Sequence, residues 1–295
     1  MELYDVLELI GDTPLISLRN ENIIAKAEFL NPGGSIKDRV ALAMIEAAER
    51  EGTLKPGMKI VEPTSGNTGI GITLIGAAKG YEVHIVMPEG MSEERKKIIR
   101  ILGGNLILTP DEESVDGAVR KAEELAKSFS AFMPQQFKNP NNAAAHYEHT
   151  AQELWDQSAG RIDAFVSGIG SGGTIQGIGS FLKKKNPDIS IIAAEPKNVS
   201  AILGHEPGLH KIQGIGDGFI PDLLDVSLID RVIEVTDDDA IETTRELAAS
   251  NSFLCGISSG ANVWAARQLA KEHPDWIIAT VLPDRAERYF STGLL

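Results

Sequence analysis

The sequence predicts an α/β protein of two packed domains, with mostly parallel, twisted sheets flanked by helices. Its 295 residues are enough for one long or two closely packed domains. Short β-rich runs alternate with longer helical patterns almost from end to end, which is typical of βαβ units. Hydrophobic residues make up 42% and charged residues 24%, as in ordinary globular proteins. The chain is therefore expected to fold around extensive apolar cores.

Short apolar runs separated by turn formers are the predicted strands, and helices are expected to fill the gaps between them. After Ser35, the spacing of Ile36, Val40, Met44 and Ala47 predicts a helix with one core-facing stripe. Ser35 is expected to cap that helix. The predicted strands are 23–29, 58–61, 83–87, 105–108, 164–167, 190–194 and 277–281.

Two segments rich in turn formers, 31–34 and 137–142, are the expected crossing points between the domains. They predict a smaller, mobile domain over residues 38–140 and a larger domain made of 1–37 and 141–295. The Gly- and Pro-rich stretch 196–221 is predicted to be a long loop over the site.

The charge of the chain excludes several classes of partner. Its formal net charge is −14, which repels nucleic acid and anionic lipid. The start of the chain does not resemble a signal peptide, and no apolar run is long enough to span a bilayer, so a cytoplasmic protein is expected. The single cysteine, Cys255, excludes an internal disulfide framework and a zinc site with several cysteines. No metal site is expected.

Three glycine- or serine-rich segments follow predicted strands and open predicted helices. Free backbone amides gather at such junctions, and each segment is therefore a candidate anion site. They are 64–69, 168–174 and 256–261.

The middle segment contains the pattern G-x-G-x-x-G, so a nicotinamide dinucleotide site is one alternative. Such a site also needs an acidic residue about 20 positions further on, and Glu195 lies somewhat late for that role. The preferred interpretation is that the crowded amides of 170–174, together with the Thr174 hydroxyl, bind one phosphate monoester.

Lys37 is predicted to lie in the first turn of a helix, where the helix dipole disfavours a second positive charge. The pKa of its amine should therefore fall, which favours formation of a Schiff base. The alternative is a solvated surface cluster made of Lys37, Asp38 and Arg39.

Taken together and in order, these segments resemble the cysteine synthase family, pyridoxal-phosphate enzymes of fold type II that include O-acetylserine sulfhydrylases and cystathionine β-synthases. The similarity extends from residues 6–11 to residues 284–289 and implies a tryptophan synthase β-like fold. The segments that carry it are 31–39, 64–69, 168–174 and 256–261.

The resemblance implies specific roles for individual residues. Lys37 would join covalently to pyridoxal 5'-phosphate, and Asn67 would bind the phenolic oxygen of the cofactor. Ser258 would face its pyridine nitrogen. The phosphate would rest on Gly170, Ser171, Gly172, Gly173 and Thr174. The substrate carboxylate would be bound by Thr64, Ser65, Thr68 and Gln136.

The same resemblance implies a β-replacement reaction that converts O-acetyl-L-serine and sulfide into L-cysteine and acetate, with Lys37 as the general base. Family members are usually homodimers, and some bind the C-terminal tail of serine acetyltransferase in the active site. Both are expected partners here, beside the amino-acid substrate and sulfide.

Asp217 departs from the family pattern, since sulfhydrylases commonly carry alanine and cystathionine β-synthases tyrosine at this position. A carboxylate there would repel anionic bisulfide, but it could orient water or bind the ammonium of a second amino acid. A cysteine-consuming enzyme that releases hydrogen sulfide and makes serine, lanthionine or cystathionine therefore stays open. A nicotinamide oxidoreductase and a catalytically silent sensor are the alternatives from other classes.

Overall fold

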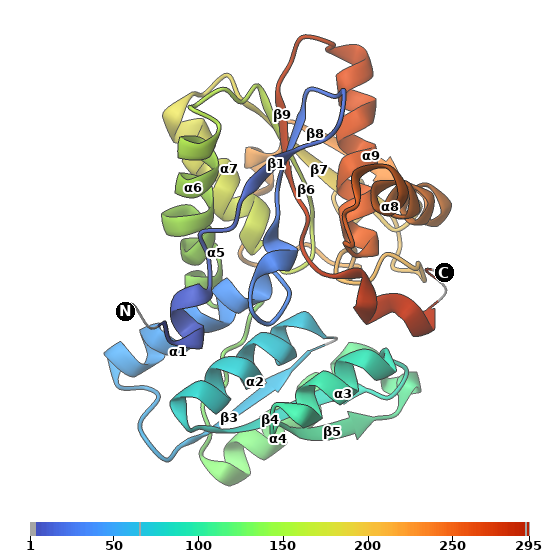
Figure 1. Ribbon diagram of the computed structural model, residues 1–295. Coiled ribbons are helices and arrows are strands. Elements are labelled where there is room, and N and C mark those ends of the chain that lie inside the picture. Colours follow the sequence, from blue (N-terminus) through green and yellow to red (C-terminus); the bar gives the residue numbers. More distant parts are fainter. Residues whose placement is uncertain (1–3, 65, 293, 295) are drawn as a thin grey trace.

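The protein contains two separate β-sheets, drawn one above the other in Figure 1. The computed structural model describes residues 4–64, 66–292 and 294. Within them, the larger sheet has the strand order β1-β2-β9-β6-β7-β8 and is parallel except for the β1–β2 pair. The smaller sheet, β3-β4-β5, is entirely parallel. The strands are β1 Leu15–Ser17, β2 Ile23–Lys26, β3 Lys59–Pro63, β4 Glu82–Pro88, β5 Asn105–Thr109, β6 Ala164–Gly168, β7 Ser190–Pro196, β8 Arg231–Val235 and β9 Ile278–Val281.

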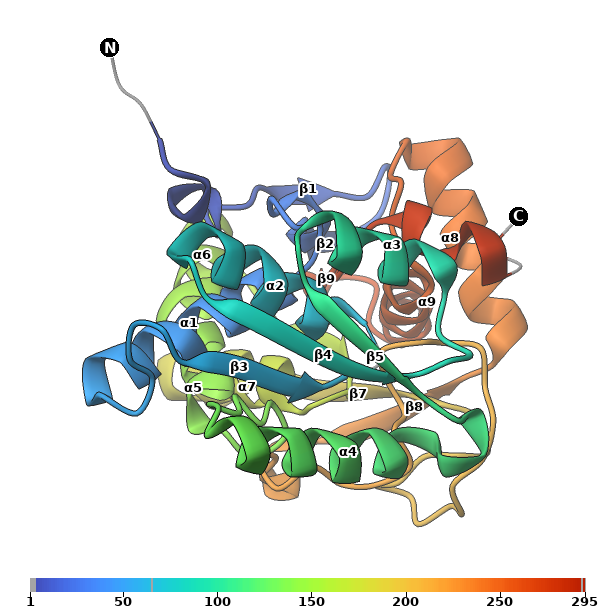
Figure 2. The same ribbon diagram turned by 90° about the horizontal axis from the view of Figure 1, so that it is seen from below.

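Helices cover both faces of each sheet, which is how parallel sheets are normally buried. α6 and α7 lie on one side of the larger sheet, and α8 and α9 lie on the other (Figure 1). α2 and α3 cover the face of the smaller sheet that looks toward the larger one, and α4 covers the opposite face (Figure 2). The helices are α1 Lys37–Glu51, α2 Asn67–Lys79, α3 Glu93–Ile101, α4 Ser114–Phe129, α5 Pro140–Ala145, α6 Ala151–Gln157, α7 Gly173–Lys185, α8 Asp237–Asn251 and α9 Ile257–Glu272. The α/β class predicted from the sequence is confirmed.

The apolar core around the larger sheet lies on both faces of its central strands. Phe165 and Val166 are neighbours on β6, and both are completely buried. Phe165 packs into the cluster on the α6 and α7 side, whereas Val166 packs into the cluster on the α8 and α9 side. Consecutive residues of a strand point to opposite faces, so this sheet is apolar on both sides.

All seven predicted strands are present, although their ends differ by up to three residues. The predicted strand 23–29 stops at Lys26, and a 3-10 turn, Glu28–Leu30, follows because Glu28 enters a buried ion network. The sequence analysis missed β1 and β8. β1 has three residues, and β8 lies at a sheet edge and carries charges that weaken the apolar pattern.

The start of α1 is fixed by two close contacts. Ile36, not Ser35, is the N-cap residue, so the predicted cap is wrong by one position. Ser35 Oγ instead accepts a hydrogen bond from the Lys37 backbone N–H at 3.2 Å. On α2, a side chain at Gly71 would come within 2.9 Å of the Lys37 carbonyl oxygen. This glycine therefore lets α2 pack directly against the first turn of α1.

None of the helices in the described part of the chain is both long and apolar enough to cross a membrane.

Candidate active site

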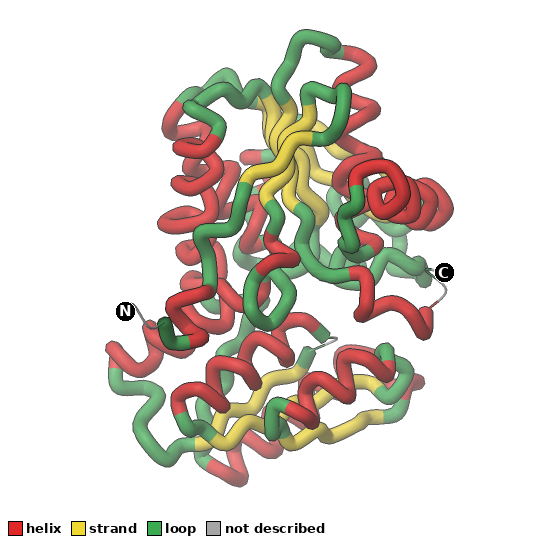
Figure 3. The backbone as a smooth tube through the Cα atoms, in the orientation of Figure 1, coloured by secondary structure: helices red, strands yellow, loops and turns green. Residues whose placement is uncertain are grey.

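A cavity of about 410 Å³ lies where the carboxyl ends of parallel strands from both sheets come together. Figure 3 shows the loops that connect strands and helices gathering between the two sheets. This is the usual position of a ligand site in an open α/β sheet. The cavity is lined by residues of all three glycine- or serine-rich segments, by Lys37 and Gln136, and by residues 207–210 and 213–218. The long loop predicted over the site is thus confirmed.

Lys37 is the first residue of α1, and its side chain reaches the second of the glycine-rich segments. Its Nζ donates a hydrogen bond to Ser171 Oγ at 3.0 Å. Burial lowers the pKa of the amine to about 8, and the nearby Asp217 carboxylate opposes this shift. The expected direction is confirmed, but the main cause is burial and not the helix dipole proposed from the sequence.

The 170–174 turn has the geometry of an anion cradle. A side chain at Gly170 would approach the Gly214 carbonyl oxygen to 2.3 Å, and Gly172 has a φ of 81°. α7 begins at Gly173, so the first amides of this helix have no partners within it. Helix-end amides beside a lysine amine fit a phosphorylated aldehyde cofactor. The amides can bind the phosphate of such a cofactor, and the amine can react with its carbonyl group.

Two further cofactor candidates line the same cavity. Ser258 is the second residue of α9 and is almost completely buried. Asn67 opens α2, but its side chain already contacts the C-terminal segment. Its Nδ2 donates to Asp284 Oδ2 at 2.7 Å, and its Oδ1 accepts from Arg288. A bond from Asn67 to the cofactor therefore stays a prediction.

The predicted carboxylate-binding residues come from the smaller sheet and the turn after α4. Thr64 and Thr68 line the cavity together with Gln136. Thr68 Oγ1 donates to Gln136 Oε1 at 2.6 Å, and the Gly66 backbone N–H donates to Thr64 Oγ1 at 3.1 Å. Ser65 lies outside the described residues. The structure brings the other three side chains to one side of the cavity.

Asp217 lies at the mouth of this cavity, in the loop opposite Lys37. Although the side chain is exposed at the mouth, the cavity walls desolvate its carboxylate and raise its pKa, while Lys37 and His210 oppose the shift. The carboxylate is close enough to the reacting amine for each group to change the pKa of the other.

Sequence reasoning missed three buried polar residues around the site. His146 lies in a π-helical turn, and its ring nitrogens contact Thr174 Oγ1 at 3.3 Å and Thr150 Oγ1 at 3.0 Å. Asn142 and Glu62 are also buried. No local motif marks Glu62 or His146, whose contacts with the site span 74 and 28 positions of the chain. Asn142 could have been identified from the sequence, since it lies in the turn-rich segment 137–142.

Glu195, the residue considered for binding the ribose of a dinucleotide, has a structural role instead. Glu195 is buried at the end of β7, where its carboxylate accepts hydrogen bonds from Ser200 Oγ and from the Ile202 backbone N–H. It therefore holds its own loop and does not line the cavity. This observation removes the main support for a nicotinamide site.

A two-sheet α/β fold with a lysine amine facing a helix-end anion cradle defines an enzyme that binds a phosphorylated carbonyl cofactor. Comparison with known proteins agrees, since the model of the pyridoxal-phosphate dependent enzyme family matches residues 6–284. The chain belongs to this family, and pyridoxal phosphate is its cofactor.

Individual relatives narrow the relationship. A cysteine synthase of Staphylococcus aureus is 49% identical over 298 residues, which cover 98% of this chain and 96% of the relative. An O-acetylserine dependent cystathionine β-synthase from Helicobacter pylori has a TM-score of 0.94 at 39% identity, covering 100% and 99% of the two chains. A hydrogen sulfide-producing enzyme from Fusobacterium nucleatum has a TM-score of 0.95 at 41% identity, covering 98% and 100%. The predicted family and fold type are confirmed.

Proposed function

We propose that this protein is a cysteine synthase that converts O-acetyl-L-serine and sulfide into L-cysteine and acetate. The observation that carries the proposal is the position of the Lys37 amine, which lies in one cavity with the 170–174 turn and the Thr64–Thr68 side. The 49% identity to a cysteine synthase over nearly the whole chain supports this choice of reaction.

The residues around the cavity divide the work of binding. Gly170, Ser171, Gly172, Gly173 and Thr174 would hold the phosphate, Ser258 would face the pyridine nitrogen, and Asn67 would contact the phenolic oxygen. When bound, pyridoxal phosphate withdraws electrons from the α-carbon of an amino acid and so makes its proton removable. Thr64, Ser65, Thr68 and Gln136 would bind the substrate carboxylate by hydroxyl and amide donors.

Lys37 is suited to move that proton. A free amine with a pKa of about 8 is partly neutral near neutral pH, so Nζ can accept the α-proton and later return it. Ser171, which accepts a hydrogen bond from Nζ, would keep the amine directed into the cavity. The covering loop 207–218 would exclude water during the replacement.

We also propose a division of labour between two domains. Residues 38–140 would form the smaller, mobile domain, and residues 1–37 with 141–295 would form the larger one. Binding of the substrate carboxylate at Thr64 and Thr68 would draw the smaller domain toward the larger and close the cavity. Two separate sheets, each with its own core clusters, are compatible with such a movement.

The finer expectations about partners and location belong to the same proposal. We infer a cytoplasmic homodimer that could also bind the C-terminal tail of a serine acetyltransferase at the cavity mouth. The exposed apolar side chains Leu209, Phe219 and Ile220 near that mouth support a peptide contact. Light scattering of the purified protein, with and without a synthetic tail peptide, tests the homodimer and the peptide contact.

Lys37→Ala tests the central assignment. The variant should lose about 10³-fold or more in cysteine formation, because both the covalent attachment and the proton acceptor are removed. It should also lose the visible absorbance of the lysine-bound cofactor. Lys55→Ala, which changes an exposed lysine that does not line the cavity, should keep both properties. Retained absorbance and turnover in Lys37→Ala would refute the proposal.

A second candidate function uses Asp217. Its carboxylate lies in the cavity near Lys37 and could orient water or a second amino acid, and the similarity to a hydrogen sulfide-producing enzyme favours this alternative. The test compares sulfide consumption with O-acetyl-L-serine against sulfide release from L-cysteine alone. Faster release, abolished by Asp217→Ala but not by the exposed Asp222→Ala, would replace cysteine synthesis by cysteine breakdown as the main reaction.

A further inference from the structure

Glu62 is a buried carboxylate near the end of β3, two residues before Thr64. Its Oε1 accepts the Gln136 backbone N–H at 3.0 Å, and its Oε2 accepts the Gln135 backbone N–H at 2.8 Å. Within residues 4–64, 66–292 and 294 it forms no ion pair, and burial raises its pKa to about 7. A buried acid without a cation is costly, so its bonds to this turn call for a functional explanation.

The turn that Glu62 holds is a strained one. Gln135 has a φ of 56°, in the left-handed region that side chains with a Cβ rarely adopt. The Gln135 carbonyl oxygen accepts two further backbone N–H groups, from Lys138 at 2.9 Å and from Asn139 at 3.0 Å. Glu62 accepts the backbone N–H groups of Gln135 and of the following residue, one on each side of the strained Gln135 Cα. Together these bonds keep the turn in a conformation that the chain would not favour alone.

The turn matters because its next side chain reaches the cavity. Gln136 Oε1 accepts a hydrogen bond from the Thr68 hydroxyl. The orientation of the Gln136 side chain is therefore fixed by a residue that is itself proposed to bind the substrate carboxylate. In the described part of the chain no protein group accepts from Gln136 Nε2, and the side chain lines the cavity. Its amide N–H groups are thus free to donate to an anionic ligand.

A second link fastens the turn to the other side of the site. Asn142 Nδ2 donates to the Gln136 carbonyl oxygen at 2.8 Å and to Ser171 Oγ at 2.9 Å. Ser171 in turn accepts from Lys37. The turn therefore spans the distance between β3 of the smaller sheet and the helix-end cradle of the larger one.

We propose that Glu62 is a positioning residue for the substrate carboxylate, which acts by fixing the strained 135–136 turn so that the Gln136 amide faces the ligand beside Thr68. The proposal rests on the proposed function insofar as the ligand is an α-amino acid bound through its carboxylate. Glu62 itself does not line the cavity, so its effect on the ligand passes through Gln136.

The test uses Glu62→Gln holoenzyme, in which one of the two acceptors at the turn becomes a donor. The change in visible absorbance of the bound cofactor reports equilibrium binding of L-alanine, L-serine and, as a ligand without a carboxylate, ethanolamine. We expect roughly tenfold weaker binding of both amino acids, since a charged hydrogen-bond network is lost, with ethanolamine binding unchanged. In steady state, KM should rise much more than kcat falls.

Two further variants separate positioning from general damage. Glu82→Gln removes an exposed carboxylate from the neighbouring strand β4 and should leave binding of all three ligands unchanged. Glu62→Gln combined with Gln135→Gly should regain part of the lost affinity, because glycine adopts a positive φ without strain. If Glu62→Gln alone does not fold, Glu62→Asp and the Gln135→Gly background provide the same comparison.

The outcomes are distinct. Equal loss of affinity for L-serine and ethanolamine, or unchanged L-serine binding in a folded Glu62→Gln variant, would overturn the positioning role. Wild-type protein that binds L-serine but does not form cysteine from O-acetyl-L-serine and sulfide would instead refute the proposed function, and leave the test of Glu62 intact.

Discussion

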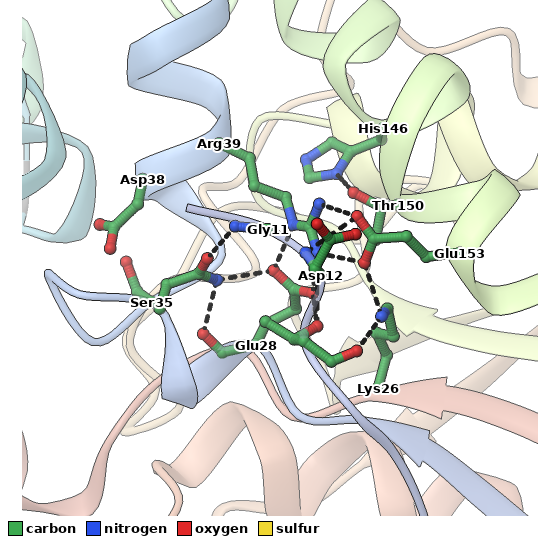
Figure 4. A network of polar contacts seen from close by, with 12 residues as sticks. Gly11, Asp12, Lys26, Glu28, Ser35, Asp38, Arg39, His146, Thr150 and Glu153 are labelled. Atoms are coloured by element: carbon green, nitrogen blue, oxygen red, sulfur yellow. Dashed lines mark hydrogen bonds and ion pairs between the residues drawn. The ribbon is translucent and has the colours of Figure 1, made fainter. Parts of the chain in front are cut away.

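The acids beside the larger sheet and the acid Glu62 beside the smaller sheet are held in opposite ways. Beside the larger sheet, Glu28 and Glu153 share the cations Arg39 and Lys26 in the network of Figure 4. Arg39 Nε lies 2.7 Å from Glu28, and Arg39 Nη1 lies 2.6 Å from Glu153. Beside the smaller sheet, the partners of Glu62 among the described residues are two backbone N–H groups.

The difference appears in the protonation of the acids. Although burial alone would raise it, the pKa of Glu153 is lowered to about 2 by hydrogen bonds and charges from Arg39 and Lys26. Burial raises the pKa of Glu62 to about 7; the Gln136 and Gln135 N–H groups oppose this shift, and no cation of the described residues does. Glu153 stays ionised and helps to anchor Arg39 in the first turn of α1, whereas Glu62 binds its turn with a carboxyl group that gains a proton already near neutral pH.

Arg39→Met should give the largest loss of stability, because it leaves Glu28 and Glu153 buried with less compensating charge. We expect the free energy of unfolding to fall by about 3–5 kcal/mol, measured by urea denaturation followed by circular dichroism. A loss below about 1 kcal/mol would mean that the ion network contributes little to stability. Pairing with cations would then not distinguish Glu28 and Glu153 from Glu62.

The two kinds of acid should also respond oppositely to pH. Between about pH 4.5 and 7, folded Glu62 keeps a proton that the unfolded chain has lost, so its contribution to stability falls as pH rises through this range. Glu153 contributes stability above about pH 4.5 and loses it as pH falls toward about 2.

The difference in unfolding free energy between wild type and Glu62→Gln isolates the first of these effects. From about pH 7.5 to about pH 5.5 it should shift by about 2 kcal/mol in favour of wild type. Urea titrations at several pH values measure it. A shift of the opposite sign would show that Glu62 is ionised throughout and that its environment is not desolvating.

Thr68→Val should have a smaller effect, since it removes a single hydroxyl of similar size. Loss of its bond to Gln136 should lower the free energy of unfolding by about 1 kcal/mol and weaken amino-acid binding severalfold. Thr73→Val is the matched control, because that hydroxyl is buried on the same helix but bonds to the Gly69 carbonyl oxygen. The control should lose stability without losing affinity for amino acids.

The smallest change is expected at a surface ion pair. Lys121 and Glu124 lie 2.9 Å apart on α4, with both side chains exposed. Lys121→Met should leave the urea midpoint unchanged within error, because solvent and salt screen such pairs. An effect comparable to that of Arg39→Met would show that burial is not what separates the networks.

Much of the site could be predicted because its residues stand in contiguous segments. The 168–174 turn and the lysine at the start of α1 follow from local rules of helix ends and glycine-rich turns. Glu62 could not be found in this way, since it contacts Gln136 across 74 positions of the chain and carries no motif of its own. Asn142 lies in the turn-rich segment 137–142, but its bond to Ser171 spans 29 positions and depends on the fold. The ion network joins Lys26 to Glu153 over a still longer stretch of the chain.

By itself, the sequence determined the α/β class and the positions of seven strands, and it pointed to the glycine-rich turns and to Lys37 as candidate site residues, because periodicity and helix-end chemistry are local properties. Only the tertiary structure decided which buried acids are paired, which cause lowers the pKa of Lys37, and which turn supports Gln136. Those features depend on burial and on distances between segments far apart in the chain, and these exist only after the two sheets have packed.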